Sequence, residues 1–296
     1  MTPLDSFPWA PVTPSGPIPH WTGEGFLLSE NKTRILAYGE ASSHWSDELT
    51  SLHESEAGRD HPIDLASRRL AVESMRSLGA NRPIDILDVG CSSGFVLEEL
   101  QNALPQASLI GADYIRGPLE GLARRMPRLP LLQFDLRHCP LPDACVDGIT
   151  CLNVLEHIDD HVAALRNMHR ILRPGGIAHV EVPAGPQLFD IYDEHLMHHR
   201  RYRLRELVQI ARETGFGIRL ATHLGFIIYP VFWSVKKNNR RKLALSAAAK
   251  QQLVAAQIRS SRQSRLFSWA VQCESALGRF MSFPIGIRCV VVLTKG

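Results

Sequence analysis

Short apolar segments alternate with amphipathic segments over most of the chain from residue 83 onward. Strands are expected at 84–89, 109–113, 129–136, 146–153, 177–182 and 217–223, and helices at 94–104, 119–126, 159–172 and 204–214. A Pro-Gly-Gly run at 174–176 is expected to stop the helix before it. Strands alternating with helices of this length predict a parallel sheet with right-handed crossovers. A helix over 64–78, with Asp64 as its N-cap, and a last strand over 287–294 complete the pattern.

Two segments depart from this alternation. Residues 1–30 are rich in Pro, Gly and Ser and contain Trp9 and Trp21, so we expect an extended arm that docks onto the protein. Residues 266–281 place apolar side chains at helical spacing before the last strand. The sequence therefore predicts an α/β core with an arm at one end and a helical insertion near the other.

The composition is that of a globular protein. The 296 residues are 45% hydrophobic and 21% charged, which excludes disorder throughout. The six cysteines form no CxxC pair and are expected to be reduced thiols of an intracellular protein. The N-terminal residues do not resemble a secretory signal, and the apolar run 224–235 is shorter than the about 20 residues that span a bilayer. We expect a cytoplasmic protein and leave contact with a membrane surface open.

The net charge of +3 hides an uneven distribution of basic residues. No Asp or Glu lies between 236 and 265, and the basic residues of that segment are Lys236, Lys237, Arg240, Arg241, Lys242, Lys250, Arg259, Arg262 and Arg265. A second basic cluster lies at 200–205. Both favour an anionic ligand or surface, such as a phosphate, a carboxylate or an anionic lipid. A solvated basic face is the alternative.

A tight glycine turn follows the first core strand. Gly90 and Gly94 allow the backbone to turn and approach a nucleotide-like ligand closely. Asp113 ends the next strand, where its carboxylate can accept bonds from ribose hydroxyls, and Asp135 ends the third, near an adenine amino group. The dinucleotide fingerprint G-x-G-x-x-G is absent. S-adenosylmethionine (SAM) contains no pyrophosphate, and its ammonium group would be served by Asp88.

Five ordered segments carry a resemblance to a known family: ILDVGCSSG, GADY, QFDL, CLNVLEHIDD and ILRPGGIAHVEVP. They resemble the class I SAM-dependent methyltransferases, in the group that includes ubiquinone-biosynthesis-like enzymes. The resemblance covers about 83–216 and implies a Rossmann-like seven-stranded sheet, parallel except for one antiparallel strand. Ser92 stands where many members have a second glycine. The cofactor implied is SAM, with S-adenosylhomocysteine as product.

The resemblance also implies the domain organisation and the cofactor site. The expected parts are an N-terminal arm and lid (1–63), the SAM-binding core (64–226), a basic and apolar helical insertion facing the acceptor or a membrane (227–286), and the final core strand (287–296). The turn at 88–94 should hold the methionine end, Asp113 the ribose, and Asp135 with Leu136 the adenine. The full cofactor set is Asp88, Gly90, Cys91, Ser93, Gly94, Asp113, Tyr114, Asp135, Leu136, Asn153 and Val154.

Candidate catalytic residues follow the fourth and fifth strands. His157 could act as a general base for a hydroxyl acceptor, or it could simply pack against the cofactor loop. The segment 192–202 resembles an H-x-R-R-Y pattern of some relatives, carried by His198, Arg201 and Tyr202. It could form a lid in which His198 or Tyr202 touches the acceptor, or a structural loop. No metal is expected, because the histidines do not form an HExxH motif.

Three functions remain open at this point. The first is a SAM-dependent methyltransferase acting on oxygen or carbon of a small or lipid-linked, anionic acceptor. The second is a non-catalytic SAM-fold module that binds a membrane or a partner through 227–286, and the third is a nicotinamide enzyme. Nucleic acid is not expected as a partner, because the basic segment lacks interleaved aromatic residues for stacking. The oligomeric state is left open.

Overall fold

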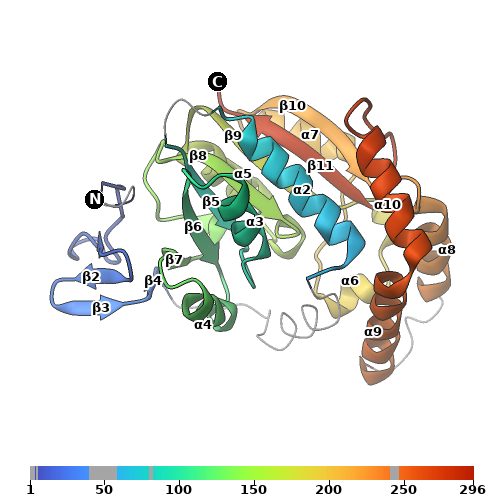
Figure 1. The fold of residues 1–296 in the computed structure, drawn as a ribbon, viewed down its shortest axis with the longest axis horizontal. Helices are drawn as coiled ribbons and strands as arrows, with labels where there is room; N and C mark the ends of the chain where they lie inside the picture. The colour runs from blue at the N-terminus through green and yellow to red at the C-terminus, as the bar shows by residue number, and fades with distance from the viewer. Residues whose placement is uncertain (1–3, 5, 40–58, 80–82, 241–246) are drawn as a thin grey trace.

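A computed structural model of the protein describes residues 4, 6–39, 59–79, 83–240 and 247–296. Its centre is an eight-stranded sheet in the order β10-β11-β9-β8-β5-β6-β7-β4 (Figure 1). The strands in that order are β10 (Gly217–Leu224), β11 (Arg288–Thr294), β9 (Leu172–Pro183), β8 (Val146–Leu152), β5 (Asp85–Val89), β6 (Ser108–Asp113), β7 (Leu131–Gln133) and β4 (Ile35–Ala37). β11 is antiparallel to both of its neighbours, whereas the pairs from β9 to β4 are parallel.

Helices cover both faces of the sheet because successive strand residues point to opposite sides. Ile86 packs with α2 (Pro62–Arg76), α3 (Phe95–Ala103) and α4 (Arg116–Arg125), whereas Leu87 belongs to the core shared with α5 (His161–Ile171) and α7 (Leu204–Glu213). Both side chains are fully buried. The near-continuous apolar sequence of β5 is therefore that of a strand covered on both faces.

The strand count differs from the expected seven. The eighth strand, β4, comes from the segment assigned to the N-terminal arm and pairs in parallel with β7, so that Ile35 lies opposite Leu131. The arm also forms a small antiparallel sheet of β1 (His20–Trp21), β2 (Phe26–Leu28) and β3 (Asn31–Thr33). Trp9, Trp21 and Phe26 are buried there against one another and against the main core. Residues 40–58 of the expected lid lie outside the described residues.

Three local expectations need correction. Helix α2 begins at Pro62 with His61 as its N-cap, so Asp64 lies within the first turn and is not the cap. The Pro-Gly-Gly run does not separate α5 from the next strand, because α5 ends at Ile171 and β9 runs through residues 174–176. The third core strand ends at Gln133, and Asp135 caps a short 3-10 turn, η1 (Leu136–His138).

The insertion between β10 and β11 is helical as expected. It contains α8 (Tyr229–Arg240), α9 (Ala247–Gln263) and α10 (Arg265–Leu277), with residues 241–246, including basic Arg241 and Lys242, outside the described residues. Figure 1 shows α10 lying beside α2, where Ala270 and Val271 share a buried cluster with Ile63 and Ala66. Among the described helices, none combines the length and the hydropathy needed to cross a bilayer.

Candidate functional site

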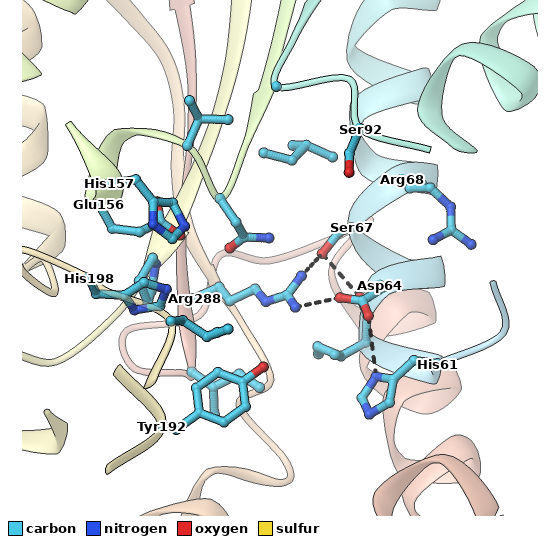
Figure 2. A pocket seen from close by; sticks show the side chains of 18 of the residues that line it. His61, Asp64, Ser67, Arg68, Ser92, Glu156, His157, Tyr192, His198 and Arg288 are labelled. Atoms are coloured by element: carbon cyan, nitrogen blue, oxygen red, sulfur yellow. Dashed lines mark hydrogen bonds and ion pairs between the residues drawn. The ribbon is translucent and has the colours of Figure 1, made fainter. Parts of the chain in front are cut away.

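One cavity of about 1180 Å³ lies at the carboxyl ends of the parallel strands. That volume exceeds the roughly 300–1,000 Å³ typical of small-molecule sites, so it has room for two ligands. It runs from the glycine turn after β5 to the helices of the insertion. Every residue of the expected cofactor set lines it, as do His157 and His198. Figure 2 shows Glu156, His157 and His198 on one side of this pocket and α2, with Asp64 and Ser67, on the other.

The glycine turn is shaped by positions that exclude a side chain. Gly90 has φ of +71°, and a β-carbon there would collide with Val154 Cγ2. Gly94 has φ of +72°, and a β-carbon there would lie 2.5 Å from Leu122 Cδ1. The backbone N–H of Ser92 donates to Asp113 Oδ2 at 2.9 Å, which fixes the turn to the end of β6. The serine in place of a second glycine is accommodated with φ of +43°.

Asp88 is a buried carboxylate in which only one of the two oxygens is hydrogen-bonded. Its Oδ1 accepts a hydrogen bond from Thr150 Oγ1 at 2.6 Å, whereas Oδ2 has no hydrogen-bond partner. Burial raises the pKa of Asp88 to about 7, despite the opposing Thr150 hydrogen bond. Because an unpaired buried carboxylate oxygen is costly, it implies a cationic ligand group. The ammonium of SAM meets that requirement, so the residues present fit the cofactor.

The two other acids of the cofactor end are held in place by local bonds. Asp113 Oδ1 accepts from the N–H of Ile115 at 2.9 Å, and its Oδ2 accepts from the N–H of Ser92. Asp135 accepts from the backbone N–H of Arg137 at 2.8 Å and from its guanidinium at 2.6 Å. Burial alone would raise the pKa of Asp135, but these bonds from Arg137 outweigh it and lower the pKa.

The far end of the cavity brings together Glu156, His157 and His198. One nitrogen of each imidazole and one carboxylate oxygen of Glu156 lie within 4.8 Å of one another. The centroids of the two imidazole rings are 4.7 Å apart, with an angle of 78° between the ring planes. Glu156 is buried, and no side chain donates to either of its oxygens. Burial raises its pKa to about 8. Two imidazoles and one carboxylate at this spacing could hold a divalent cation, so the expectation of no metal stays a prediction.

His198 is held by a carboxylate behind it. Its Nδ1 lies 2.8 Å from Asp193 Oδ1, and Arg201 Nε donates to the same oxygen at 2.7 Å. Burial opposes the charge of Asp193, but its bonds to His198 and Arg201 and the nearby Lys236 hold its pKa well below the usual range. An ionised Asp193 accepts a hydrogen bond from Nδ1–H of a neutral His198, which leaves Nε2 as an acceptor. Burial also lowers the pKa of His198, although Asp193 opposes this.

Behind this pair lies a buried charge network that the sequence did not reveal. Lys236 Nζ bonds to Asp190 Oδ1 at 2.5 Å and to Asp193 Oδ2 at 3.2 Å, and Asn239 Nδ2 donates to Asp190 Oδ2 at 2.9 Å. Asp190 and Asp193 form the capping box of α6 (Ile191–His195), a short helix within the expected loop. Lys236 and Arg201 are thus paired with buried acids, although both belong to basic clusters for which the sequence favours an anionic ligand or surface, with a solvated face as the alternative.

Tyr202 does not reach the cavity. Its hydroxyl donates to the Leu155 carbonyl at 3.1 Å, and its ring packs near His161. It therefore supports the turn η2 (Leu155–His157), which carries Glu156 and His157, and lies outside the cavity lining. Sequence reasoning also missed Arg288 on β11, whose guanidinium bonds to Asp64, Ser67 and Glu181 across the pocket (Figure 2). No motif signalled that contact, because the partners are more than a hundred residues apart.

Comparison with known proteins agrees with this geometry. The family described as a methyltransferase domain matches residues 87–180. A malonyl-[acyl-carrier protein] O-methyltransferase of Dechloromonas aromatica is 30% identical over 56% of this chain and 64% of the relative. A ubiquinone biosynthesis O-methyltransferase of Ruegeria pomeroyi is 32% identical over 39% of this chain and 48% of the relative. The chain thus spans between about half and two thirds of these relatives' lengths.

A solved structure extends the likeness in fold. Phosphoethanolamine N-methyltransferase 2 of Haemonchus contortus, in complex with SAM, aligns with a TM-score of 0.58 at 15% identity, over 86% of this chain and 58% of that one. The fold and the site define a Rossmann-like SAM-binding domain. Residues 87–180 match a methyltransferase domain, and the named relatives support the class I SAM-dependent family. Because the named relatives are methyltransferases, a non-catalytic module and a nicotinamide enzyme are not favoured.

Proposed function

We propose that the protein transfers a methyl group from SAM to oxygen or carbon of a small or lipid-linked, anionic acceptor. The observation that carries this proposal is a single cavity with an unpaired buried Asp88 oxygen at one end and the His198–Asp193 pair at the other. Two relatives whose names specify O-methyl transfer support oxygen as the acceptor atom. We further propose that it acts in the cytoplasm, at or near a membrane surface.

The residues of the cofactor end bind and orient. Asp88 would hold the ammonium group, the turn from Gly90 to Gly94 would admit the methionine portion, and Asp113 would hold the ribose. When bound, SAM supplies a methyl group already activated by its sulfonium charge. The protein therefore contributes mainly proximity and alignment, together worth several kcal/mol of the barrier, on the order of 7–11 when orientation is ideal.

The residues of the acceptor end handle a proton. A neutral His198, with Nδ1–H donating to Asp193, can accept the proton of an acceptor hydroxyl at Nε2. Asp193 then stabilises the imidazolium that forms. Its own charge is balanced by Arg201 and Lys236, which keep the carboxylate fixed and ionised. Such a positioned base typically contributes about 10²–10⁴ in rate.

Support for the acceptor class comes from the outer part of the cavity. Val231, Leu266 and Trp269 line it and are exposed, which favours an apolar group on the acceptor. The cavity's buried cations are already paired, so the support for a negative charge comes from exposed basic residues of α8–α10, such as Lys237 and Arg262.

A His198→Gln variant tests the acceptor end. Methyl-labelled SAM is incubated with lipid and aqueous extracts of the source organism, and transfer is followed over pH. We expect the rate to fall by about 10²–10⁴ while SAM affinity, measured by calorimetry, is unchanged. His195→Gln is the matched control, because His195 lies on α6 but outside the cavity lining.

Two results would contradict this assignment. Unchanged transfer in His198→Gln would remove the proposed base. Activity abolished by a chelator and restored by a divalent ion would show that His198, with Glu156 and His157, acts as a metal ligand and not as a base.

A further inference from the structure

We propose that the exposed face of α10, with the turn after it, seats the protein on an anionic lipid bilayer, and that the cavity opens onto this face. This face specifies how the protein would reach the membrane surface named in the proposed function. Only the entry of an acceptor from the bilayer rests on that function. The docking itself is argued from side-chain exposure, helical spacing and charge.

The exposed apolar side chains of the protein are concentrated in one segment. Among the described residues, all large exposed apolar side chains except Ile18, Leu27 and Met197 lie between residues 226 and 285. Concentration on this scale marks an interaction surface, whereas scattered single residues do not. The segment is the helical insertion, which packs on α2 and β11 through a separate buried cluster that includes Ala270, Val271 and Val290.

On α10 these side chains form one stripe. Leu266, Trp269, Cys273, Leu277 and Phe280 follow one another at spacings of three or four residues, which places them on one side of a helix. The exposed fractions are 74% for Leu266, 62% for Trp269, 49% for Leu277 and 88% for Phe280, which lies in the turn after the helix. The buried residues of α10 are Ala270, Val271 and Glu274, so the stripe does not take part in the core.

Within the described insertion, the exposed charges have one sign. Glu274 is the only acidic residue between 226 and 288, and it is buried, accepting the backbone N–H groups of Gly225 at 2.6 Å and Ile227 at 2.9 Å. The exposed charged residues of the described insertion and of the turn after it are Lys237, Arg259, Arg262, Arg265 and Arg279. Exposed apolar side chains on a segment whose own exposed charges are all cationic complement a bilayer that contains anionic headgroups, where each Lys or Arg near the surface adds attraction.

The cavity is continuous with this face. Leu266 and Trp269 belong both to the stripe and to the cavity lining, and Val231 of α8 lines the cavity from the other side. An amphiphilic acceptor could therefore place its reactive group near His198 while its apolar chain lies along these side chains toward the bilayer. The exposed part of the basic segment thus gains a role at the surface, whereas Lys236 is buried and paired with Asp190 and Asp193.

The test measures vesicle binding by the full chain. Sedimentation with mixed phosphatidylcholine and phosphatidylglycerol vesicles should recover the protein at low salt, with weaker recovery at high salt and with pure phosphatidylcholine. A Leu277→Glu/Phe280→Glu variant should bind the anionic vesicles more than about tenfold more weakly, because it removes two apolar contacts and adds two repulsive charges. Ile18→Glu is the matched control, because Ile18 is equally exposed but lies in the N-terminal arm.

A second measurement does not depend on those substitutions. Vesicles with brominated acyl chains should quench tryptophan fluorescence in the wild type, and Trp269→Phe should reduce that quenching. No sedimentation with anionic vesicles, or equal binding by the double variant, would overturn the proposal. So would a dimer that the double variant dissociates while vesicles bind neither protein, because a second copy would then cover the stripe.

Calorimetry with SAM separates the two proposals. Retained SAM binding together with absent vesicle binding would refute only the docking surface. Vesicle binding without SAM binding would refute the proposed function and leave the docking surface standing. The double variant should bind SAM as the wild type does, since neither substituted residue lines the cavity.

Discussion

Replacing Asp88 by asparagine tests the cofactor end with almost no change in shape. The amide can still accept the Thr150 hydrogen bond, which spans 2.6 Å in the wild type, but it carries no charge for an ammonium group. A hydrogen bond to a charged group contributes about 1.5–3 kcal/mol. The dissociation constant of SAM at pH 8 should therefore rise by roughly 10- to 150-fold, as measured by calorimetry.

The pH dependence of that affinity is a sharper signature. In the folded protein without SAM, the pKa of Asp88 is about 7, so its carboxylate is mainly ionised at pH 8 and mainly protonated at pH 6. Wild-type affinity for SAM should fall as the pH is lowered through 7, by up to about tenfold per pH unit, since the proton must first be displaced. The Asp88→Asn variant should lose this part of the pH dependence.

Thr150→Val gives the matched control. It keeps the Asp88 charge but removes the hydrogen bond that lowers the Asp88 pKa, so the pH at which affinity declines should move upward. If Asp88→Asn bound SAM as tightly as the wild type at pH 8, Asp88 would not hold the ammonium group, and the unpaired oxygen would need another explanation.

Three further changes test other parts of the site. Gly90→Ala should lower the free energy of unfolding, measured by thermal melts, by about 1–3 kcal/mol and abolish SAM binding, because Gly90 has a positive φ and an added β-carbon would collide with Val154. Gly121→Ala is the control: an added β-carbon there meets open space, so the variant should be neutral or stabilising in the same melts. Asp113→Ala should remove measurable SAM affinity, and retained micromolar binding would refute the ribose assignment. In the wild type, burial on folding raises the pKa of Glu156 from 4.5 to about 8, so the folded state binds the proton more tightly than the unfolded state. The free energy of unfolding should therefore fall as the pH rises from about 4.5 to about 8, by a few kcal/mol at most. Glu156→Gln should flatten this slope in denaturant titrations over pH, and an unchanged slope would show that Glu156 is not the group responsible.

The cofactor end was predictable because its chemistry is local in sequence. A strand, a glycine turn and a helix start lie within about ten residues of one another, and the parallel sheet then brings Asp113 and Asp135 to the same edge. The requirement for glycine at residue 90 comes from a positive φ and from the approach of Val154, the residue expected beside the ligand. Pattern and tertiary contact therefore agree at this position.

The acceptor end was less predictable because its partners are distant. His198 was a candidate, but Asp193 lies behind it only because α6 folds back within an apparent loop. Lys236 belongs to a basic segment that favours an anionic ligand or surface, yet it is buried and paired with two acids more than forty residues away. Tyr202 was a candidate to touch the acceptor, with a structural loop as the alternative, and its hydroxyl donates to the carbonyl of Leu155. Side-chain type alone could not distinguish these roles.

The edge of the sheet shows the same limit for secondary structure. β4 contains only three residues, Ile35 to Ala37, and so carries too little periodicity to be recognised. It becomes a strand because the edge of β7 offers unpaired backbone groups, to which Ile35 and its neighbours align in parallel register. The Pro-Gly-Gly run at 174–176 likewise lies within the long strand β9, although its local propensity predicts the end of the preceding helix there.

The central claim is that this cavity supports methyl transfer from SAM. The most direct measurement is a time course of label transfer from methyl-labelled SAM into acceptor extracts, with S-adenosylhomocysteine quantified in parallel by mass spectrometry. We expect equal amounts of transferred label and S-adenosylhomocysteine, with the label in the organic phase and with Asp88→Asn strongly impaired. Bound SAM with no labelled product and no S-adenosylhomocysteine in any extract would contradict it.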